Sequence, residues 1–169
     1  SGIHDPTNRK SGAVGLMQIE ESVWKNKEIK VYNYETKCDE TFKITEDTMT
    51  NLETNIKIGC MIMRQQMDFM RNNPIAALQS YNMGYGNMDY ILKSYAKDCG
   101  KSKKDILDDY YDFGYITNDY YRNMINVGDS KYVEHVLSYL GDNPTISMYI
   151  NDDTKLEINI NREKTSIRL

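Results

Sequence analysis

Apolar residues recur at steps of three and four along most of the chain, which is the spacing of one helix face. The longest such segment, from Asp47 to Arg71, predicts one amphipathic helix that ends before Pro74. Its predicted buried stripe consists of Leu52, Ile56, Cys60, Met63, Met67 and Met70. Shorter segments of the same period predict helices over residues 16–27, 75–82, 87–96, 103–111 and 117–126, and a last helix that ends before Gly141.

The periodicity changes after Pro144. Apolar and polar residues then alternate in two runs separated by the turn-forming residues 151–153, which predicts a C-terminal β-hairpin. Residues 28–45 alternate only loosely and form a loop or a small hairpin, whereas residues 1–15 are rich in turn formers. The predicted fold is therefore mainly α (α+β), with residues 1–143 as a helical domain and residues 144–169 as a hairpin extension.

Composition and charge exclude several classes of protein. The length of 169 residues suits one domain, and a net charge of −4 with a pI near 5.2 argues against a nucleic-acid binder. No segment approaches the ~18 consecutive apolar residues of a membrane span, and no signal peptide is visible. Three distant cysteines and only His4 and His135 predict neither a metal site nor a cofactor. The cysteines form one disulfide with a spare thiol, or all three are reduced.

Two glycine-punctuated stretches lie on either side of the long predicted helix. They read SGAVGLMQI at residues 11–19 and AALQSYNMGYGNM at residues 76–88. Each places an amide side chain, Gln18 or Asn82, among apolar and small neighbours. Such amides either bind hydroxyl or amide groups of a ligand in a cleft, or cap and cross-link loops of the chain itself.

In this order and separation, the two stretches resemble the lysozyme-like domain of lytic transglycosylases (SLT) and the related phage-type muramidases. The family pattern reads roughly E-S-x-F-x-P-x-A-x-S-x-x-G-A-x-G-L-M-Q-I, then a long helix, then A-L-x-A-Y-N-A-G-x-G-N-V. The matching residues are Ser1, Pro6, Gly12, Ala13, Gly15, Leu16, Met17, Gln18 and Ile19, then Ala77, Leu78, Tyr81, Asn82, Gly84, Gly86 and Asn87. The segment KYVEHVLSYL is similar to the family's closing helix, so the resemblance covers residues 1 to about 140.

The chain departs from the family pattern at three points. The family's serine ahead of the glycine falls on Arg9, with Ser11 two places later, and its small residue after Tyr-Asn is Met83. The family's general acid is the glutamate immediately before the position of Ser1. We expect that glutamate directly before Ser1 in a longer chain. The alternatives are a non-catalytic relative and a helix with its acid supplied by another polypeptide.

The resemblance implies an activity and a set of site residues. Family members cut peptidoglycan strands at the MurNAc–GlcNAc bond, and in transglycosylases the muramic 6-hydroxyl attacks internally to give a 1,6-anhydro product. Tyr81 is implied to support the acid or the oxocarbenium-like state. The implied substrate-binding residues are Ser11, Met17, Gln18, Tyr81 and Asn82. In a hydrolase, Glu35 or Asp39 is the best available second carboxylate.

The sequence thus predicts a lytic transglycosylase or muramidase that needs no cofactor and serves wall lysis or local wall penetration. Its expected partners are peptidoglycan strands and further domains of a larger phage or secretion protein, such as a lysin or a conjugation apparatus. It is expected to act outside the cytoplasm, at the bacterial cell wall. The alternative is a peptidoglycan-binding or structural relative without the catalytic glutamate, and a helical protein–protein adaptor is the third hypothesis.

Overall fold

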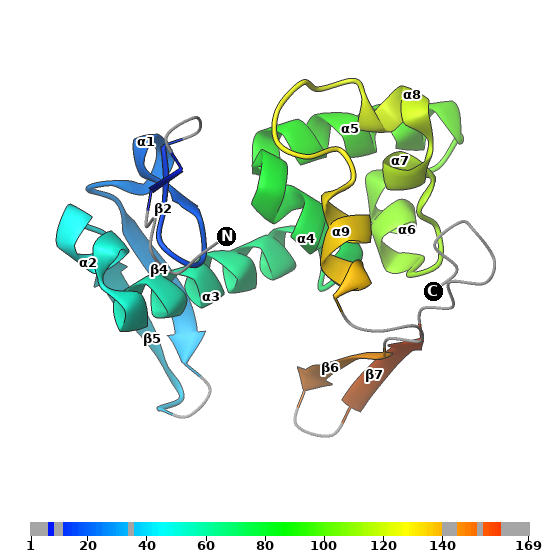
Figure 1. The fold of residues 1–169 in the computed structure, drawn as a ribbon. Coiled ribbons are helices and arrows are strands. Elements are labelled where there is room, and N and C mark those ends of the chain that lie inside the picture. The colour runs from blue at the N-terminus through cyan, green and yellow to red at the C-terminus, as the bar shows by residue number, and fades with distance from the viewer. Residues whose placement is uncertain (1–6, 9–11, 34–35, 140–144, 152–153, 160–169) are drawn as a thin grey trace. The chain divides into compact units, whose positions relative to one another are not determined.

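The computed structural model describes residues 7–8, 12–33, 36–139, 145–151 and 154–159 (Figure 1). The contacts of the chain divide it into two compact units, residues 1–65 and 66–169, with the division inside helix α3. Helices predominate, and the strands form small antiparallel sheets. The predicted mainly α fold with a C-terminal β-hairpin is therefore confirmed.

The first unit begins with a three-stranded antiparallel sheet. Its strands are β1 (Thr7–Asn8), β2 (Ala13–Val14) and β3 (Ile19–Glu20). Val14 pairs with Ile19, so residues 15–18 form the turn between β2 and β3. Gly15 and Gln18 have φ values of 72° and 51°, which a right-handed helix excludes. The helix predicted from residue 16 is therefore wrong in its first half, and α1 spans Glu21–Trp24.

The segment that the sequence left open as a loop or a hairpin is a hairpin. Strand β4 (Glu28–Asn33) pairs antiparallel with β5 (Cys38–Lys43). Apolar side chains from the strands, turns and helices of this unit meet in one core. Its fully buried members include Ile19, Ile29, Ile44, Met49 and Ile58.

The long helix predicted from residue 47 is two helices. Helix α2 (Glu46–Thr50) is capped by Thr45, and α3 (Leu52–Phe69) follows it. Asn51 separates the two helices because its ψ of 129° is extended and its side chain accepts a hydrogen bond from the N–H of Thr54.

The buried face of α3 differs from the predicted stripe. Leu52, Ile56 and Cys60 are exposed, although Met70 at the end of the stripe is buried. The residues that are buried on α3 include Asn55, Ile58, Gly59, Ile62 and Gln66. This face carries two amides and a glycine, so a pattern of apolar residues does not reveal it.

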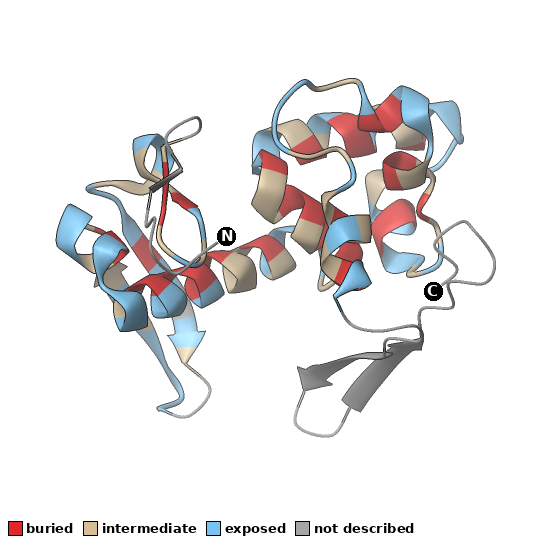
Figure 2. Cartoon of the chain, viewed as in Figure 1, coloured by how far each residue is buried: buried red, intermediate tan, exposed pale blue. Residues whose placement is uncertain are grey.

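The second unit is built around α4. Its helices are α4 (Pro74–Met83), α5 (Tyr85–Asp98), α6 (Lys103–Asp108), α7 (Gly114–Thr117), α8 (Asp119–Arg122) and α9 (Tyr132–Ser138). Asn73 caps α4 by accepting from the N–H of Ala76, and Pro74 fits its first turn. Helix α4 contacts both α5 and α9, and buried residues concentrate where these helices meet (Figure 2).

Most helices of this unit agree with the prediction. The Ser102–Asp105 capping box at the start of α6 is present, with both of its reciprocal hydrogen bonds. The single helix predicted over residues 117–126 is wrong, because α7 ends at Thr117 and a new helix begins. Asn118 caps α8 (Asp119–Arg122) by accepting from the N–H of Tyr120.

Arg122 is a buried cation that joins three helices of the second unit. Its Nε and Nη2 donate to the carbonyl of Ile116 at 3.1 and 2.9 Å, and Nη2 also donates to Glu134 Oε1 at 2.7 Å. We expect Arg122→Met to lower the free energy of unfolding by about 2–4 kcal/mol, because a buried carbonyl and a carboxylate lose their donor. Urea denaturation measures this change.

Lys104→Met is the matched control, because Lys104 forms an ion pair with Asp108 but its side chain is 65% exposed. Its expected effect is below ~1 kcal/mol. Equal losses in the two variants would contradict a structural role of Arg122.

The C-terminal hairpin is present as predicted. Strand β6 (Thr145–Asn151) pairs antiparallel with β7 (Thr154–Asn159). Ile146 lies opposite Ile158, and Met148 lies opposite Leu156, so the two alternating patterns match in register. Among the described residues, none of the helices is long and apolar enough to cross a membrane.

Candidate functional site

The turn between β2 and β3, residues 15–18, is fastened to α3 by one buried amide. Asn55 is fully buried, and its Oδ1 accepts from the N–H of Met17 at 2.9 Å. Its Nδ2 donates to the carbonyls of Val14, at 3.1 Å, and Met49, at 2.7 Å. One side chain therefore satisfies three backbone groups and fixes the turn that carries Met17 and Gln18.

Two glycines let this turn lie directly against α3. A Cβ atom on Gly15 would lie 2.2 Å from Asn55 Nδ2, and one on Gly59 would lie 2.5 Å from the Cβ of Met17. Glycine in a helix interior is unfavourable by about 1 kcal/mol relative to alanine, so Gly59 within α3 indicates a close approach. The periodicity of apolar residues did not reveal Asn55 or Gly59. A glycine inside a predicted helix was the feature of the sequence that could have indicated this close contact.

Gln18 is exposed on the turn and bonds back to it. Its Nε2 donates to the carbonyl of Gly15 at 2.8 Å, and its backbone N–H donates to the same carbonyl at 3.1 Å. Met17 beside it is half-buried. The structure thus brings Met17 and Gln18 together on one turn, with the Gln18 amide partly used by the chain itself.

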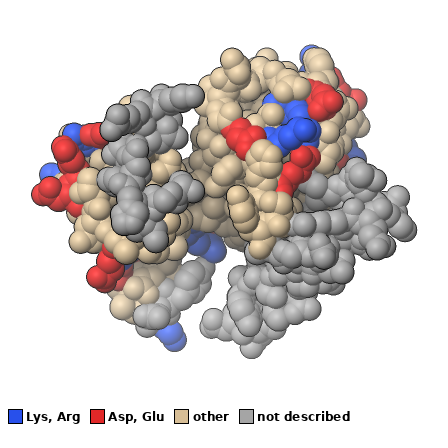
Figure 3. Space-filling view, viewed as in Figure 1, with Lys and Arg blue, Asp and Glu red and all other residues tan. Residues whose placement is uncertain are grey.

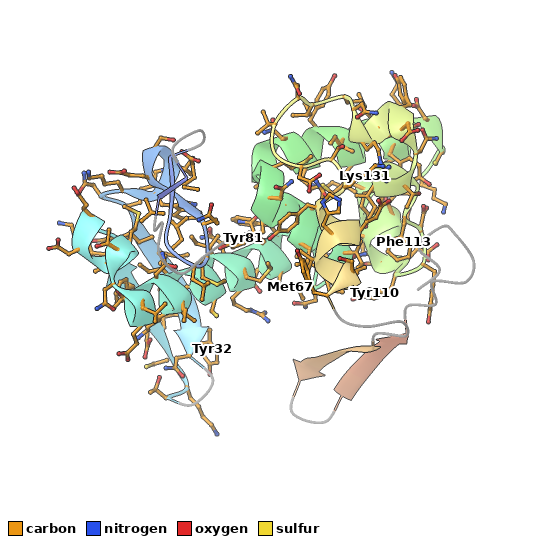
Figure 4. The ribbon with its side chains drawn as sticks, viewed as in Figure 1. Tyr32, Met67, Tyr81, Tyr110, Phe113 and Lys131 are labelled. Atoms are coloured by element: carbon orange, nitrogen blue, oxygen red, sulfur yellow. The ribbon has the colours of Figure 1, made fainter. Side chains whose placement is uncertain are left out.

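The second motif runs from α4 into the start of α5. Tyr81, labelled in Figure 4, and its neighbour Asn82 lie in the last turn of α4 and are half-buried. Asn82 Oδ1 accepts from the N–H of Asp129 at 3.2 Å, and its Nδ2 donates to the Asp129 carbonyl at 2.8 Å. Gln79 Nε2 donates to that carbonyl at 3.1 Å. Asn82 is therefore cross-linked to the loop before α9 by a reciprocal pair of hydrogen bonds.

The side chain of Asp129 holds the same loop. Its Oδ1 accepts from the N–H of Lys131 at 2.8 Å, and its Oδ2 lies 2.5 Å from His135 Nδ1. Gly128 has a φ of 73°, and a Cβ atom there would lie 2.7 Å from Asn82 Nδ2. These contacts position Asn82. Sequence analysis gives no signal for them, because Asn82 and Asp129 are 47 positions apart.

Both motifs are thus formed as compact local structures, a glycine turn against α3 and an amide-linked end of α4. A family model, the transglycosylase SLT domain, matches residues 1–103, which is more than half of the chain. The chain belongs to the transglycosylase SLT family. No curated protein and no solved structure matches it at the significance required.

The SLT match includes both glycine-punctuated stretches, residues 11–19 and 76–88. It ends at residue 103, so the similarity of α9 to the family's closing helix stays a prediction. Family membership shows a lysozyme-like domain of the type that acts on cell-wall peptidoglycan, outside the cytoplasm.

The other predicted site residues of this SLT domain are distributed as follows. Ser11 and Glu35 lie outside the described residues. Asp39 forms an ion pair with Lys30 at 2.8 Å across the β4–β5 hairpin. Met17 and Gln18 belong to the first unit, and Tyr81 and Asn82 belong to the second.

The SLT domain has mixed surface charge and free thiols. Acidic and basic side chains lie next to one another on the second unit in the view of Figure 3, in keeping with ion pairs of this unit such as that of Lys93 with Asp89. In the part of the chain that the structure describes, no group of three or more His, Cys, Asp or Glu residues could hold a metal ion. Cys38, Cys60 and Cys99 are free and exposed.

Proposed function

We propose that this SLT domain cleaves the glycan strand of peptidoglycan at the MurNAc–GlcNAc bond. The observation that supports it most is the presence of both family motifs on structured elements, with Met17 and Gln18 on a fixed turn and Tyr81 and Asn82 at the end of α4. We further propose that residues 1–143 form the lysozyme-like domain and residues 144–169 an extension. The proposed role is wall lysis or local wall penetration by a larger phage or secretion protein.

The proposed general acid is a glutamate directly before Ser1, as the family pattern implies. Its carboxyl donates a proton to the leaving glycosidic oxygen as the bond from C1 to that oxygen breaks. The muramic O6 then bonds to C1, and its proton passes to the carboxylate, so the acid is regenerated and a 1,6-anhydro end forms. A carboxyl in apolar surroundings has a raised pKa, which keeps it protonated near neutral pH.

The four described site residues have supporting roles in this proposal. Tyr81 stabilises the acid or the oxocarbenium-like state through its hydroxyl, and Met17 provides an apolar wall. Gln18 and Asn82 bind polar groups of the sugars through the amide donors and acceptors that they do not use in bonds to the chain itself. A primary amide carries two N–H donors and two acceptor lone pairs, so one bond per atom does not exhaust it.

A specific observation favours a second candidate function, a peptidoglycan-binding relative without turnover. The amides of both Gln18 and Asn82 already bond to backbone groups of the chain, which is the role expected if they only cross-link loops. Such a relative retains the folded motifs without needing the acid.

Incubation of purified peptidoglycan with the full-length parent protein separates the two functions. The proposal predicts release of soluble muropeptides by the parent protein, and loss of that release when the glutamate before Ser1 is changed to glutamine. Sedimentation with peptidoglycan, without any release of muropeptides, would overturn cleavage in favour of binding.

A further inference from the structure

Two aromatic rings lie together on the surface of the second unit. The ring centroids of Phe69, at the end of α3, and Tyr85, at the start of α5, are 4.6 Å apart with a tilt of 47°. Phe69 remains 43% exposed to solvent, and Tyr85 remains 37% exposed. An aromatic pair that stays open to solvent presents an apolar surface with the tyrosine hydroxyl at its edge.

Glycines lie on both sides of Tyr85, and the fold requires only one of them. Gly84 has a φ of 84°, which accounts for a glycine there. Gly86, in the first turn of α5, lacks a positive φ, and a Cβ atom on it would meet nothing within 4 Å. At Gly114, by contrast, a Cβ atom would lie 2.2 Å from the hydroxyl of Tyr95. A glycine that neither conformation nor packing requires is expected where a ligand approaches the backbone closely.

The charged groups that follow Tyr85 along α5 already pair within the chain. Asp89 forms ion pairs with Lys93 at 2.7 Å and with Lys103 of α6 at 2.5 Å. The carboxylate of Asp89 is thus already matched by ammonium groups. Two aromatic faces with a tyrosine hydroxyl at their edge suit a molecule with C–H faces and with hydroxyls at its rim, which describes a pyranose ring.

The position of the rings connects them to the proposed site. Tyr81 and Asn82 lie in the last turn of α4, Gly84 separates α4 from α5, and Tyr85 begins α5. Tyr85 is therefore part of the second motif, and the ring of Phe69 packs against it from the end of α3. We propose that Phe69, Tyr85 and the bare backbone at Gly86 form a stacking subsite for one sugar ring of the glycan strand. This inference rests on the proposed function, because it takes the same glycan as ligand.

The subsite is tested by binding of chitin oligosaccharides and of purified peptidoglycan to the full-length protein and its variants. Tyr85→Ala and Phe69→Ala are expected to weaken binding of the oligosaccharide about tenfold each, and Tyr85→Trp is expected to retain it. Tyr90→Ala is the matched control, since Tyr90 is a 54% exposed tyrosine on the same helix, and its affinity should equal that of the wild type.

Gly86→Leu separates a ligand effect from a folding effect. Because the space at Gly86 is open, this variant should keep the melting temperature of the wild type while losing about tenfold in affinity. Unchanged affinity in Gly86→Leu and Tyr85→Ala, with wild-type binding intact, overturns the subsite and leaves the proposed function standing. Failure of the wild type to bind peptidoglycan at all overturns the proposed function, and the subsite with it.

Discussion

Asn55→Ala lowers the free energy of unfolding by about 3–5 kcal/mol, the largest stability effect that we expect of a single substitution in this chain. The Asn55 side chain is fully buried and bonds to the N–H of Met17 and the carbonyls of Val14 and Met49. Alanine removes the hydrogen bonds that the Asn55 side chain makes to these three backbone groups. Urea denaturation followed by circular dichroism measures the loss.

Asn55→Asp is informative because it retains the acceptor for Met17 but removes both donors and adds a buried charge, so it should also be strongly destabilising. Asn123→Ala is the control, since the exposed Asn123 makes one local bond to the carbonyl of Asp119. Its expected effect is below ~1 kcal/mol. A loss at Asn55→Ala no larger than that at Asn123→Ala would show that the turn does not depend on this amide.

Tyr81→Phe is expected to reduce kcat about 10²-fold with little change in peptidoglycan binding. The substitution removes the hydroxyl that we propose stabilises the acid or the oxocarbenium-like state, whereas the apolar ring that packs at the end of α4 remains. The rate of muropeptide release by the full-length protein at saturating peptidoglycan measures kcat, and sedimentation with peptidoglycan measures binding.

Tyr90→Phe provides the control for this loss, because Tyr90 lies on α5 and is exposed. It should release muropeptides at the wild-type rate. A folded Tyr81→Phe protein with wild-type kcat would remove Tyr81 from the proposed mechanism, and a variant that loses binding in proportion to rate would reassign it to substrate binding.

Most helices of the second unit could be predicted from the sequence, because apolar residues recur on their buried faces. Met88, Ile91 and Leu92 on α5 are buried at the positions that periodicity indicates. The Ser102–Asp105 capping box could also be predicted from the sequence, because it is a local pattern within four residues.

The first unit was harder to predict because its decisive contacts are polar or involve glycine. The turn at residues 15–18 looks helical by the spacing of its apolar residues, but the positive φ of Gly15 and Gln18 makes it a turn between strands. The face of α3 that contacts this turn contains Asn55 and Gly59. Neither residue contributes to an apolar stripe.

The candidate site was predictable only as two motifs. Their residues could be named from the sequence, yet the cross-link from Asn82 to Asp129 joins distant positions and has no local signature. The exposed pair of Phe69 and Tyr85 could not be predicted from the sequence either, because it depends on where α3 ends and α5 begins.

Mass spectrometry of the products released from purified peptidoglycan by the full-length protein tests the central claim most directly. Cleavage by a lytic transglycosylase predicts muropeptides that end in 1,6-anhydro-muramic acid, each lighter by one water than the corresponding hydrolysis product. Products with reducing muramic ends would contradict internal attack by the 6-hydroxyl and indicate a hydrolase. An absence of any released muropeptide from a folded protein that binds peptidoglycan would contradict cleavage itself.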